Sequence, residues 1–345
     1  MSSSLPFSNE TVYLFQNNLN WISAFLVMAI GVLGVITNAL ILLLFFKEKS
    51  ERTSFNLICA FRAASNTIIL FLTFLLVFLP KMLIGYSIYP PMLESIGIHF
   101  SLTLYLGNEY QIILISFNRF CALFLAIYYS KLCRFIYTLM ALCAIYFYRL
   151  VRFLMQEIPA DIRGCFSSFS MEQLSWIPDF NSMCLDDTED NLFYVVLFTF
   201  FAISIINVII LLKTISFYWT SNKGHVADKE MKKKIRKNVV LFFQTILQDS
   251  LYLIDLSFTY KLSGLSSSRI WTFISNTLVW ECVHSLDGCL QIRITYTNFS
   301  VFFRFIMIMF NERLAILKRR FHPNGSVSNT NRQLFIKTRT SPSVG

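Results

Sequence analysis

The stretch that most constrains the fold is residues 101–130, SLTLYLGNEYQIILISFNRFCALFLAIYYS, a long apolar run with charged residues inside it. Glu109 lies near its middle and Arg119 lies near its end. A charged side chain at the centre of a membrane helix costs about 2.5–3.5 kcal/mol on insertion scales. Two such residues in one span therefore predict a helix that is surrounded by other helices and turns its charges inward.

The composition assigns most of the chain to the membrane. Of the 345 residues, 55% are hydrophobic and only 14% are charged, whereas a soluble domain carries about 25% charged residues. A net charge of +10 is compatible with nucleic-acid binding. The basic residues gather in a few loops and in the tail, however, as membrane topology requires. We therefore expect an integral membrane protein in a lipid bilayer, with no nucleic-acid partner.

Apolar segments of helix length follow one another along the chain. We expect seven of them, at residues 22–46, 55–79, 101–130, 135–148, 192–212, 239–258 and from 270 onward. The second ends at Pro80, and the fourth is short for a span unless Arg149 and Arg152 extend to the interface. The predicted fold class is an all-α membrane protein with a seven-transmembrane helix bundle over residues 21–310, between an N-terminus (1–20) and a tail (311–345).

The basic residues orient this bundle. Lys and Arg crowd into residues 229–237 before the sixth segment, and the crowd includes Lys232, Lys233 and Lys234. Because cytoplasmic loops carry the excess of Lys and Arg, we expect an extracellular N-terminus and a cytosolic, largely disordered tail. We expect this basic cluster to attract anionic lipid, to dock a cytosolic partner, or to do both. An extracellular N-terminus makes Asn9, in Asn-Glu-Thr, a candidate glycosylation site.

Polar side chains inside the apolar segments must find partners. We expect an inter-helix polar network of Asn38, Arg62, Asp249, His284 and Asp287. Arg62 either extends to the interface or pairs with an acid on another helix. His284 and Asp287 share one helix face, which fits hydrogen bonding between helices better than a metal or proton site, since no second His lies at helical spacing. We predict no metal and no cofactor.

Three further polar residues within the spans are candidates for lining a ligand pocket. They are Glu109 in the third segment and Tyr252 and Asp255 in the sixth. Gln244, Gln248 and Asp255 follow one another at helical spacing on one face, which should look into the bundle. Packing between helices is an equally open interpretation for each of these residues.

The longest polar stretch before the tail, residues 156–191, is acidic and fits an outside loop. Cys165 and Cys184 lie in it on either side of Trp176. In an oxidising compartment they can pair, and closing the loop of roughly twenty residues would contribute about 3 kcal/mol on the chain-entropy model. The alternative is two free thiols.

Short motifs in a fixed order along the seven segments identify a family. They lie at residues 52–55, 62–66, 105–109, 118–122, 129–131, 165–184, 248–255, 284–288 and 310–311. In this order they resemble the nematode serpentine receptor class x, which is a family of seven-transmembrane chemoreceptors. Residues 34–38 and the triplet Asn118-Arg119-Phe120 also resemble the wider superfamily of rhodopsin-like G-protein-coupled receptors.

The resemblance implies a function and its partners. It implies a plasma-membrane receptor of sensory neurons that detects an environmental small molecule and signals through a heterotrimeric G protein. It places Arg119, with Asn118 and Phe120, at the coupling end of the third helix, and we add Lys232, Lys233 and Lys234 to that surface. We expect no enzyme, because the sequence has no HExxH motif and no recognisable nucleophile–base pair. The alternative is a small-solute transporter or channel, which intramembrane acids would also suit.

The chain departs from the family pattern in three places. No Cys lies between residues 92 and 100, so the usual bridge from the third helix to the second outer loop cannot form, and the pair Cys165–Cys184 would have to substitute within the loop. Ala126 stands where the family commonly has Pro. After Gly288, about twenty residues precede Phe310-Asn311, and their alternating pattern suits a strand. We hypothesise that residues 290–304 derive from a retained intron or a gene-model error. The alternative is a true insertion that leaves a defective receptor.

Overall fold

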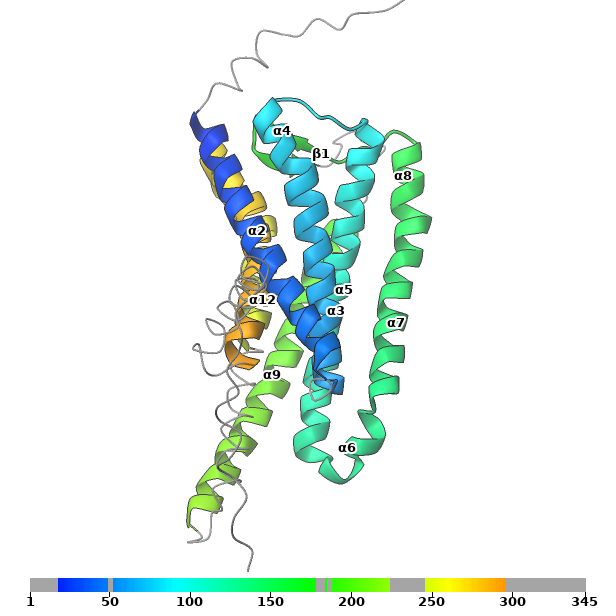
Figure 1. Cartoon of the computed structure of the whole chain (residues 1–345), viewed down its shortest axis with the longest axis vertical. Coiled ribbons are helices and arrows are strands. Elements are labelled where there is room, and N and C mark those ends of the chain that lie inside the picture. Colours follow the sequence, from blue (N-terminus) through cyan, green and yellow to red (C-terminus); the bar gives the residue numbers. More distant parts are fainter. Residues whose placement is uncertain (1–17, 49–51, 178–183, 185–187, 224–245, 296–345) are drawn as a thin grey trace, which may run out of the picture. The chain divides into compact units, whose positions relative to one another are not determined.

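The computed structural model describes residues 18–48, 52–177, 184, 188–223 and 246–295. Over these residues the chain forms seven long helical segments (Figure 1). Their bounds are α2 (Asn18–Lys47); α3 (Ser54–Ile69) continued by η2 (Leu70–Phe78) and α4 (Leu79–Ile84); α5 (Pro91–Phe124); α7 (Phe135–Arg152) continued by η3 (Phe153–Glu157) and α8 (Ile158–Ile162); α9 (Thr188–Lys223); a helix described over 246–257 and continued by η4 (Phe258–Leu262) and η5 (Ser263–Leu265); and α11 (Arg269–Thr272) continued by η6 (Phe273–Leu278) and α12 (Val279–Thr295). The predicted all-α membrane bundle is confirmed.

Three of the described helices are long and apolar enough to cross a membrane. They span Asn18–Lys47, Ser54–Ile84 and Phe135–Ile162. Helices α5 and α12 are less apolar because they carry Glu109, Arg119 and Asp287 along their length. These charged positions are the ones whose contacts define the site below.

The sequence analysis predicted that the second helical segment ends at Pro80, but the helix continues beyond this residue. Its first turn is capped by Thr53, whose side chain accepts a hydrogen bond from the backbone N–H of Asn56. Residues 70–78 then wind as a wider π-helix, and Pro80 lies in the first turn of α4. Proline lacks an N–H and crowds the carbonyl four residues before it. The wider turn accommodates that misfit, so the helix continues to Ile84 and ends at Gly85 with φ 88°.

Two other predicted boundaries were wrong. The fourth segment does not stop at residue 148 but continues through Arg149 and Arg152 to Ile162. The strand-like interpretation of residues 290–304 fails where it can be compared, because α12 is helical to Thr295. Residues 296–304 lie outside the described part of the chain, and the domain limits at residues 20 and 310 stay predictions.

A small hairpin closes one end of the helices. Strands β1 (Ser168–Ser170) and β2 (Ser175–Ile177) are antiparallel, with Phe169 opposite Trp176. Phe169 packs on Phe78 of η2, with 4.4 Å between ring centroids, and Thr277 of η6 donates to the carbonyl of Leu174 at 2.7 Å. We call this the hairpin end; the opposite end carries α6 (Ala126–Leu132) and is called the α6 end (Figure 1).

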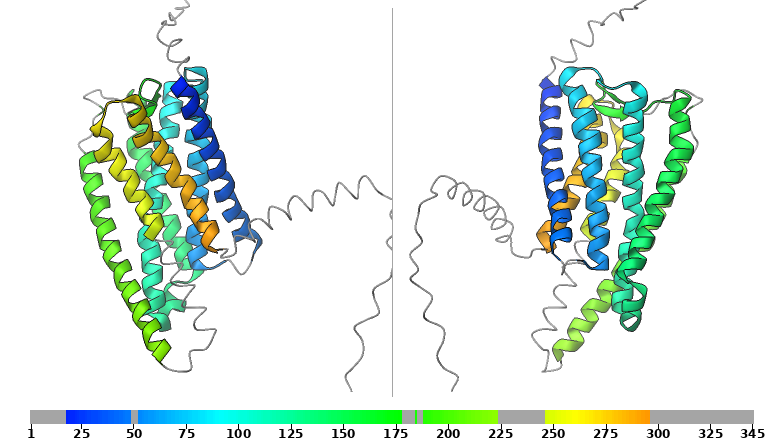
Figure 2. Two further views of the ribbon diagram at one scale, coloured as in Figure 1. Left: turned by 90° about the vertical axis from the view of Figure 1, so that its left-hand side faces the viewer. Right: turned by 45° about the vertical axis from the view of Figure 1, so that its right-hand side comes forward.

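Helix α12 lies between α2 and the helix at 246–262 (Figure 2). Arg269 fixes its start at the hairpin end, because its guanidinium donates to Asn20 of α2 and, at 2.6 Å, to the carbonyl of Met171. The start of α2 therefore lies at the hairpin end as well.

Two apolar clusters enclose a polar layer. The cluster toward the hairpin end contains Phe74, Phe78 and Trp280, and the cluster toward the α6 end contains Ile58 and Leu142. Along α3, the polar residues 62–66 fall between Ile58 and Ile69, both of them fully buried. The bundle therefore holds Arg62, Ser65 and Asn66 near mid-height, where an unpaired charge is most costly in a bilayer.

Candidate functional site

The centre of the polar layer is an ion pair between α3 and α12. Nε of Arg62 lies 3.0 Å from Oδ2 of Asp287, and the two side chains are 1% and 0% exposed. Asp287 also accepts hydrogen bonds from Asn66 at 2.7 Å and from Gln248 at 2.7 Å. Of the two alternatives left open for Arg62, the structure therefore has the one in which it pairs with an acid on another helix.

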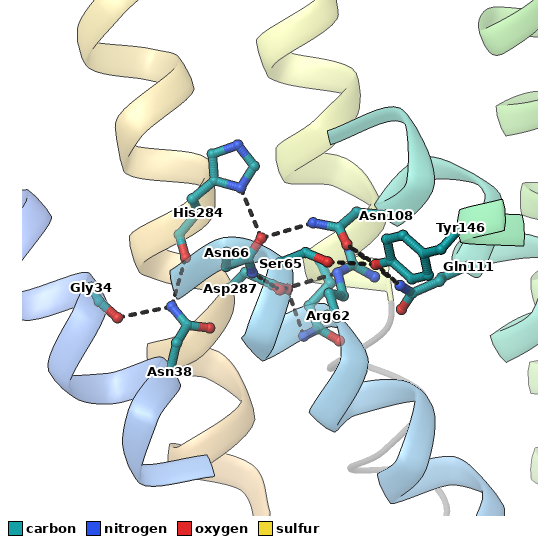
Figure 3. A network of polar contacts seen from close by, with 11 residues as sticks. Gly34, Asn38, Arg62, Ser65, Asn66, Asn108, Gln111, Tyr146, His284 and Asp287 are labelled. Carbon is teal, nitrogen blue, oxygen red and sulfur yellow. Dashed lines mark hydrogen bonds and ion pairs between the residues drawn. The ribbon is translucent and has the colours of Figure 1, made fainter. Parts of the chain in front are cut away.

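Asn66 extends the layer from this pair to its neighbours (Figure 3). Its Oδ1 accepts from Nδ2 of Asn108 at 2.9 Å and lies 2.8 Å from Nδ1 of His284. Asn38 of α2 donates to the carbonyls of Gly34 at 2.8 Å and of His284 at 3.1 Å. These contacts link α2, α3, α5 and α12.

Tyr146 of α7 completes the layer on its other side. Its hydroxyl donates to Oδ1 of Asn108 at 2.9 Å, lies 2.6 Å from Oγ of Ser65, and accepts from Gln111. Gly107 makes room for the ring, because a Cβ at that position would lie 2.8 Å from Cε1 of Tyr146. We call the connected set the central network; its members are Asn38, Arg62, Ser65, Asn66, Asn108, Gln111, Tyr146, Gln248, His284 and Asp287.

The predicted network contained four of these ten residues, and a fifth, Gln248, was expected only to face into the bundle. Asn66 lies one turn after Arg62, and Asn108 and Gln111 share a face of α5, so their helical spacing was a usable signal. Tyr146 and Ser65 carried no such signal in the sequence, since a Tyr or a Ser inside an apolar span is an ordinary packing residue. Asp249 was expected in the network, but its recorded hydrogen bond is to Asn207 of α9, at 3.4 Å.

The three pocket candidates lie beside the central network: Glu109 is next to Asn108 on α5, and Tyr252 and Asp255 follow Gln248 toward the hairpin end. The rings of Tyr105 and Tyr252 have centroids 5.5 Å apart, so they bring the faces of α5 and the helix at 246–257 together. Tyr252 also carries the Arg62 guanidinium over its ring at 4.5 Å. Asp255 is 3% exposed and interacts with the Tyr105 side chain, while its Oδ1 has no hydrogen-bond partner among the described residues.

At the α6 end, the triplet of α5 makes aromatic and polar contacts. The Arg119 guanidinium lies over the Phe55 ring at 5.1 Å. Asn118 accepts a hydrogen bond from the Tyr129 hydroxyl of α6 at 3.4 Å, and Phe120 stacks on Phe124 with 4.7 Å between centroids. Lys232, Lys233 and Lys234 lie outside the described residues, as does Asn9.

At the hairpin end, side chains tie the loop to α5 where no Cys is available. Glu94 accepts from Lys81 at 2.8 Å and from the backbone N–H of Phe169 at 2.7 Å. Ser95 donates to Asp161 at 2.6 Å and accepts from the backbone N–H of Ser167 at 2.8 Å. The loop therefore has polar anchors to α5, besides its internal disulfide.

That disulfide joins Cys165 and Cys184, whose Cα atoms are 5.5 Å apart. Among the described residues, no three His, Cys, Asp or Glu side chains are grouped so that they could hold a metal ion.

Comparison with known proteins identifies the architecture. A family model described as serpentine type 7TM GPCR chemoreceptor Srx matches residues 28–295. A search of curated proteins finds no match. The matched region includes every member of the central network, the triplet at 118–120 and the three pocket candidates.

Proposed function

Because the chain belongs to the Srx family of serpentine seven-transmembrane G-protein-coupled chemoreceptors, we propose that it detects an environmental small molecule and activates a heterotrimeric G protein at the plasma membrane of a sensory neuron. The observation that carries the proposal is the central network. It joins α2, α3, α5, α7, α12 and the helix at 246–257 through one buried ion pair. A movement of any of these helices must therefore rearrange the same contacts.

Ligand binding would act on this network through Tyr252. That side chain contacts both the pocket candidates and Arg62. A ligand that moves the helix at 246–257 would shift Gln248 against Asp287, which it contacts at 2.7 Å. The ligand favours whichever arrangement of the bundle it binds more tightly, as population shift requires.

The coupling surface in this proposal is the α6 end. Arg119, Asn118 and Phe120 lie there on α5, and we propose from the sequence alone that Lys232, Lys233 and Lys234 also take part in coupling. We propose that the hairpin end is extracellular and the α6 end cytosolic, which agrees with the basic loops.

A matched pair of variants tests coupling. Arg119→Gln should lower ligand-dependent nucleotide exchange on the G protein at least about tenfold, since it removes the charge held over Phe55. Arg134→Gln, an exposed residue at the same end, should leave exchange within about twofold. Equal exchange in both variants, measured at equal receptor amounts, would exclude Arg119 from coupling. Ligand-driven ion flux without any G protein would instead favour the transporter or channel.

Topology is tested with epitope tags. A tag at the N-terminus should be labelled on intact cells, and a tag at the C-terminus only after permeabilisation. Labelling of both tags from one side would contradict seven crossings.

The segment at 290–304 stays a hypothesis of its own. The family match ends at residue 295, inside that segment. Transcript reads that cross residues 290–304 without interruption would refute a retained intron. Reads that skip the segment would support one.

A further inference from the structure

Two buried carboxyl oxygens beside the central network have no hydrogen-bond partner among the described residues. Oδ1 of Asp255 and Oε1 of Glu109 are both inaccessible and make no hydrogen bond to a described residue. Asp255 is 3% exposed as a whole. A buried polar atom without a hydrogen bond is costly, and most such atoms in folded proteins are satisfied. An unsatisfied pair at one place in the bundle therefore calls for an explanation.

The two acids flank one ring contact, with Glu109 on its side toward the α6 end and Asp255 on its side toward the hairpin end. Tyr105 and Glu109 are one turn apart on α5, and Tyr252 and Asp255 are three residues apart on the helix at 246–257. The Tyr105–Tyr252 ring contact at 5.5 Å brings these two faces together. Electrostatic contacts also cross between the helices, since Glu109 interacts first with Arg62 and then with Asp249 and Asp255, and Asp255 interacts with Tyr105.

The neighbouring cation is shared among several acids. Arg62 pairs with Asp287 at 3.0 Å and its charge also acts on Glu109 and Asp249. Asp249, which lies on the same helix as Asp255, accepts a hydrogen bond from the neutral side chain of Asn207, so this contact brings no positive charge to the site. The site therefore has more carboxyl groups than the described residues near it can neutralise.

The rest of the lining is aromatic. Tyr105, Tyr252 and Trp280 surround His284, with centroid distances of 5.7, 6.4 and 6.2 Å to its ring. Carboxylates combined with aromatic faces recognise organic ammonium groups, which donate charged hydrogen bonds and also bind ring faces. A small inorganic cation is bound by oxygen ligands alone, whereas an organic ammonium also uses the ring faces of this lining.

We propose that the ligand of this receptor is a small organic amine in its protonated form, which binds between α5 and the helix at 246–257 and donates to Oδ1 of Asp255 and Oε1 of Glu109. This inference rests on the proposed function and specifies the class of ligand. The ammonium supplies the positive charge that the site lacks, and its apolar part contacts the rings of Tyr105 and Tyr252. Because the Arg62 guanidinium lies over the Tyr252 ring, a ligand that displaces Tyr252 also displaces Arg62.

Binding is tested on the purified full-length receptor by thermal unfolding, which requires no G protein. The probes are phenethylamine and benzylamine, each compared with its neutral isostere, 2-phenylethanol or benzyl alcohol, at millimolar concentration. A ligand that binds only the folded state raises the unfolding temperature. We expect a rise with at least one cation and none with its neutral isostere. No rise with either cation, or an equal rise with the neutral compounds, overturns the proposal.

Matched variants locate the site. Asp255→Asn and Glu109→Gln should each weaken cation binding at least about tenfold. Glu281→Gln removes a different buried acid, which lies on α12 against Gly31 of α2, and should leave binding unchanged. A loss of binding in Glu281→Gln equal to that in Asp255→Asn would place the amine elsewhere and overturn the assignment.

The same probes separate this inference from the proposed function. Cation binding without nucleotide exchange would retain the site and contradict the receptor function. Nucleotide exchange driven by neutral compounds alone would retain the receptor and contradict the amine site. Stabilisation by sodium chloride as strong as that by the amines would show an inorganic ion site and also overturn the proposal.

Discussion

The two groups of buried acids in this bundle differ in their partners. Asp287 in the central network contacts Arg62, Asn66 and Gln248, whereas Oδ1 of Asp255 and Oε1 of Glu109 contact no described hydrogen-bond partner. Burial is similar for Asp287 and Asp255, at 0% and 3% exposure. The difference teaches that burial of a charge does not by itself indicate binding; an unpaired oxygen favours binding where a second acid and aromatic faces lie beside it.

This comparison has an energetic consequence. Removing one member of a buried ion pair leaves the other charge uncompensated and costs about 3–5 kcal/mol. Removing a carboxyl oxygen that has no partner takes away an unfavourable burial and costs little. The two kinds of acid should therefore respond to neutralisation in opposite ways.

The largest effect is expected for Asp287→Leu. This change leaves Arg62 buried without its acid and removes the acceptor of Asn66 and Gln248, so the free energy of unfolding should fall by about 3–5 kcal/mol. Thermal unfolding of the purified receptor and its amount at the cell surface measure the loss. The double variant Arg62→Met/Asp287→Leu should recover much of the stability. Failure of the double variant to recover any of it would mean that the pair contributes through more than charge compensation.

A smaller effect is expected at the hairpin end. Glu94→Ala removes the acceptor of the Phe169 backbone N–H and the partner of Lys81, and should lower the free energy of unfolding by about 1–3 kcal/mol. Proteolysis of the hairpin in the folded receptor should also become faster. Ser87→Ala, which alters a neighbouring exchange of hydrogen bonds with Tyr89, serves as the control. Equal protection of the hairpin in both variants would show that Glu94 is no anchor.

The smallest effect on stability is expected at Asp255. Asp255→Asn should change the free energy of unfolding by less than about 1 kcal/mol, or raise it, because the acid has an unsatisfied oxygen. The measurement is thermal unfolding without ligand. A loss as large as that in Asp287→Leu would mean that Asp255 has a structural partner and would remove the contrast between the two groups.

Local patterns predicted much of the bundle but few of its contacts. Seven apolar segments, their order and the basic loops follow from spacing and charge along the sequence. The partner of Arg62 does not, because Asp287, Asp249 and Asp255 all lie in apolar segments and only the three-dimensional packing selects among them. The continuation past Pro80 depends on π-helical turns at 70–78, for which the sequence has no known signal.

The loop at the hairpin end was the least predictable part. The strands Ser168–Ser170 and Ser175–Ile177 are three residues long, which is too short for an alternating pattern to be recognised. Their position depends on contacts far away in sequence, such as Phe169 with Phe78 and Leu174 with Thr277. The motif around residues 165–184 predicted where the loop lies in the sequence, but the conformation of the loop depends on its contacts with the helices.

The most direct test compares Asp255→Asn with Asp287→Asn by thermal unfolding, each with and without phenethylamine. The account predicts that Asp287→Asn unfolds at a lower temperature but is still stabilised by the amine. It predicts that Asp255→Asn unfolds near the wild-type temperature and is no longer stabilised. If both variants lose the same stability and both keep the response to the amine, the division between a structural network and a ligand site is wrong.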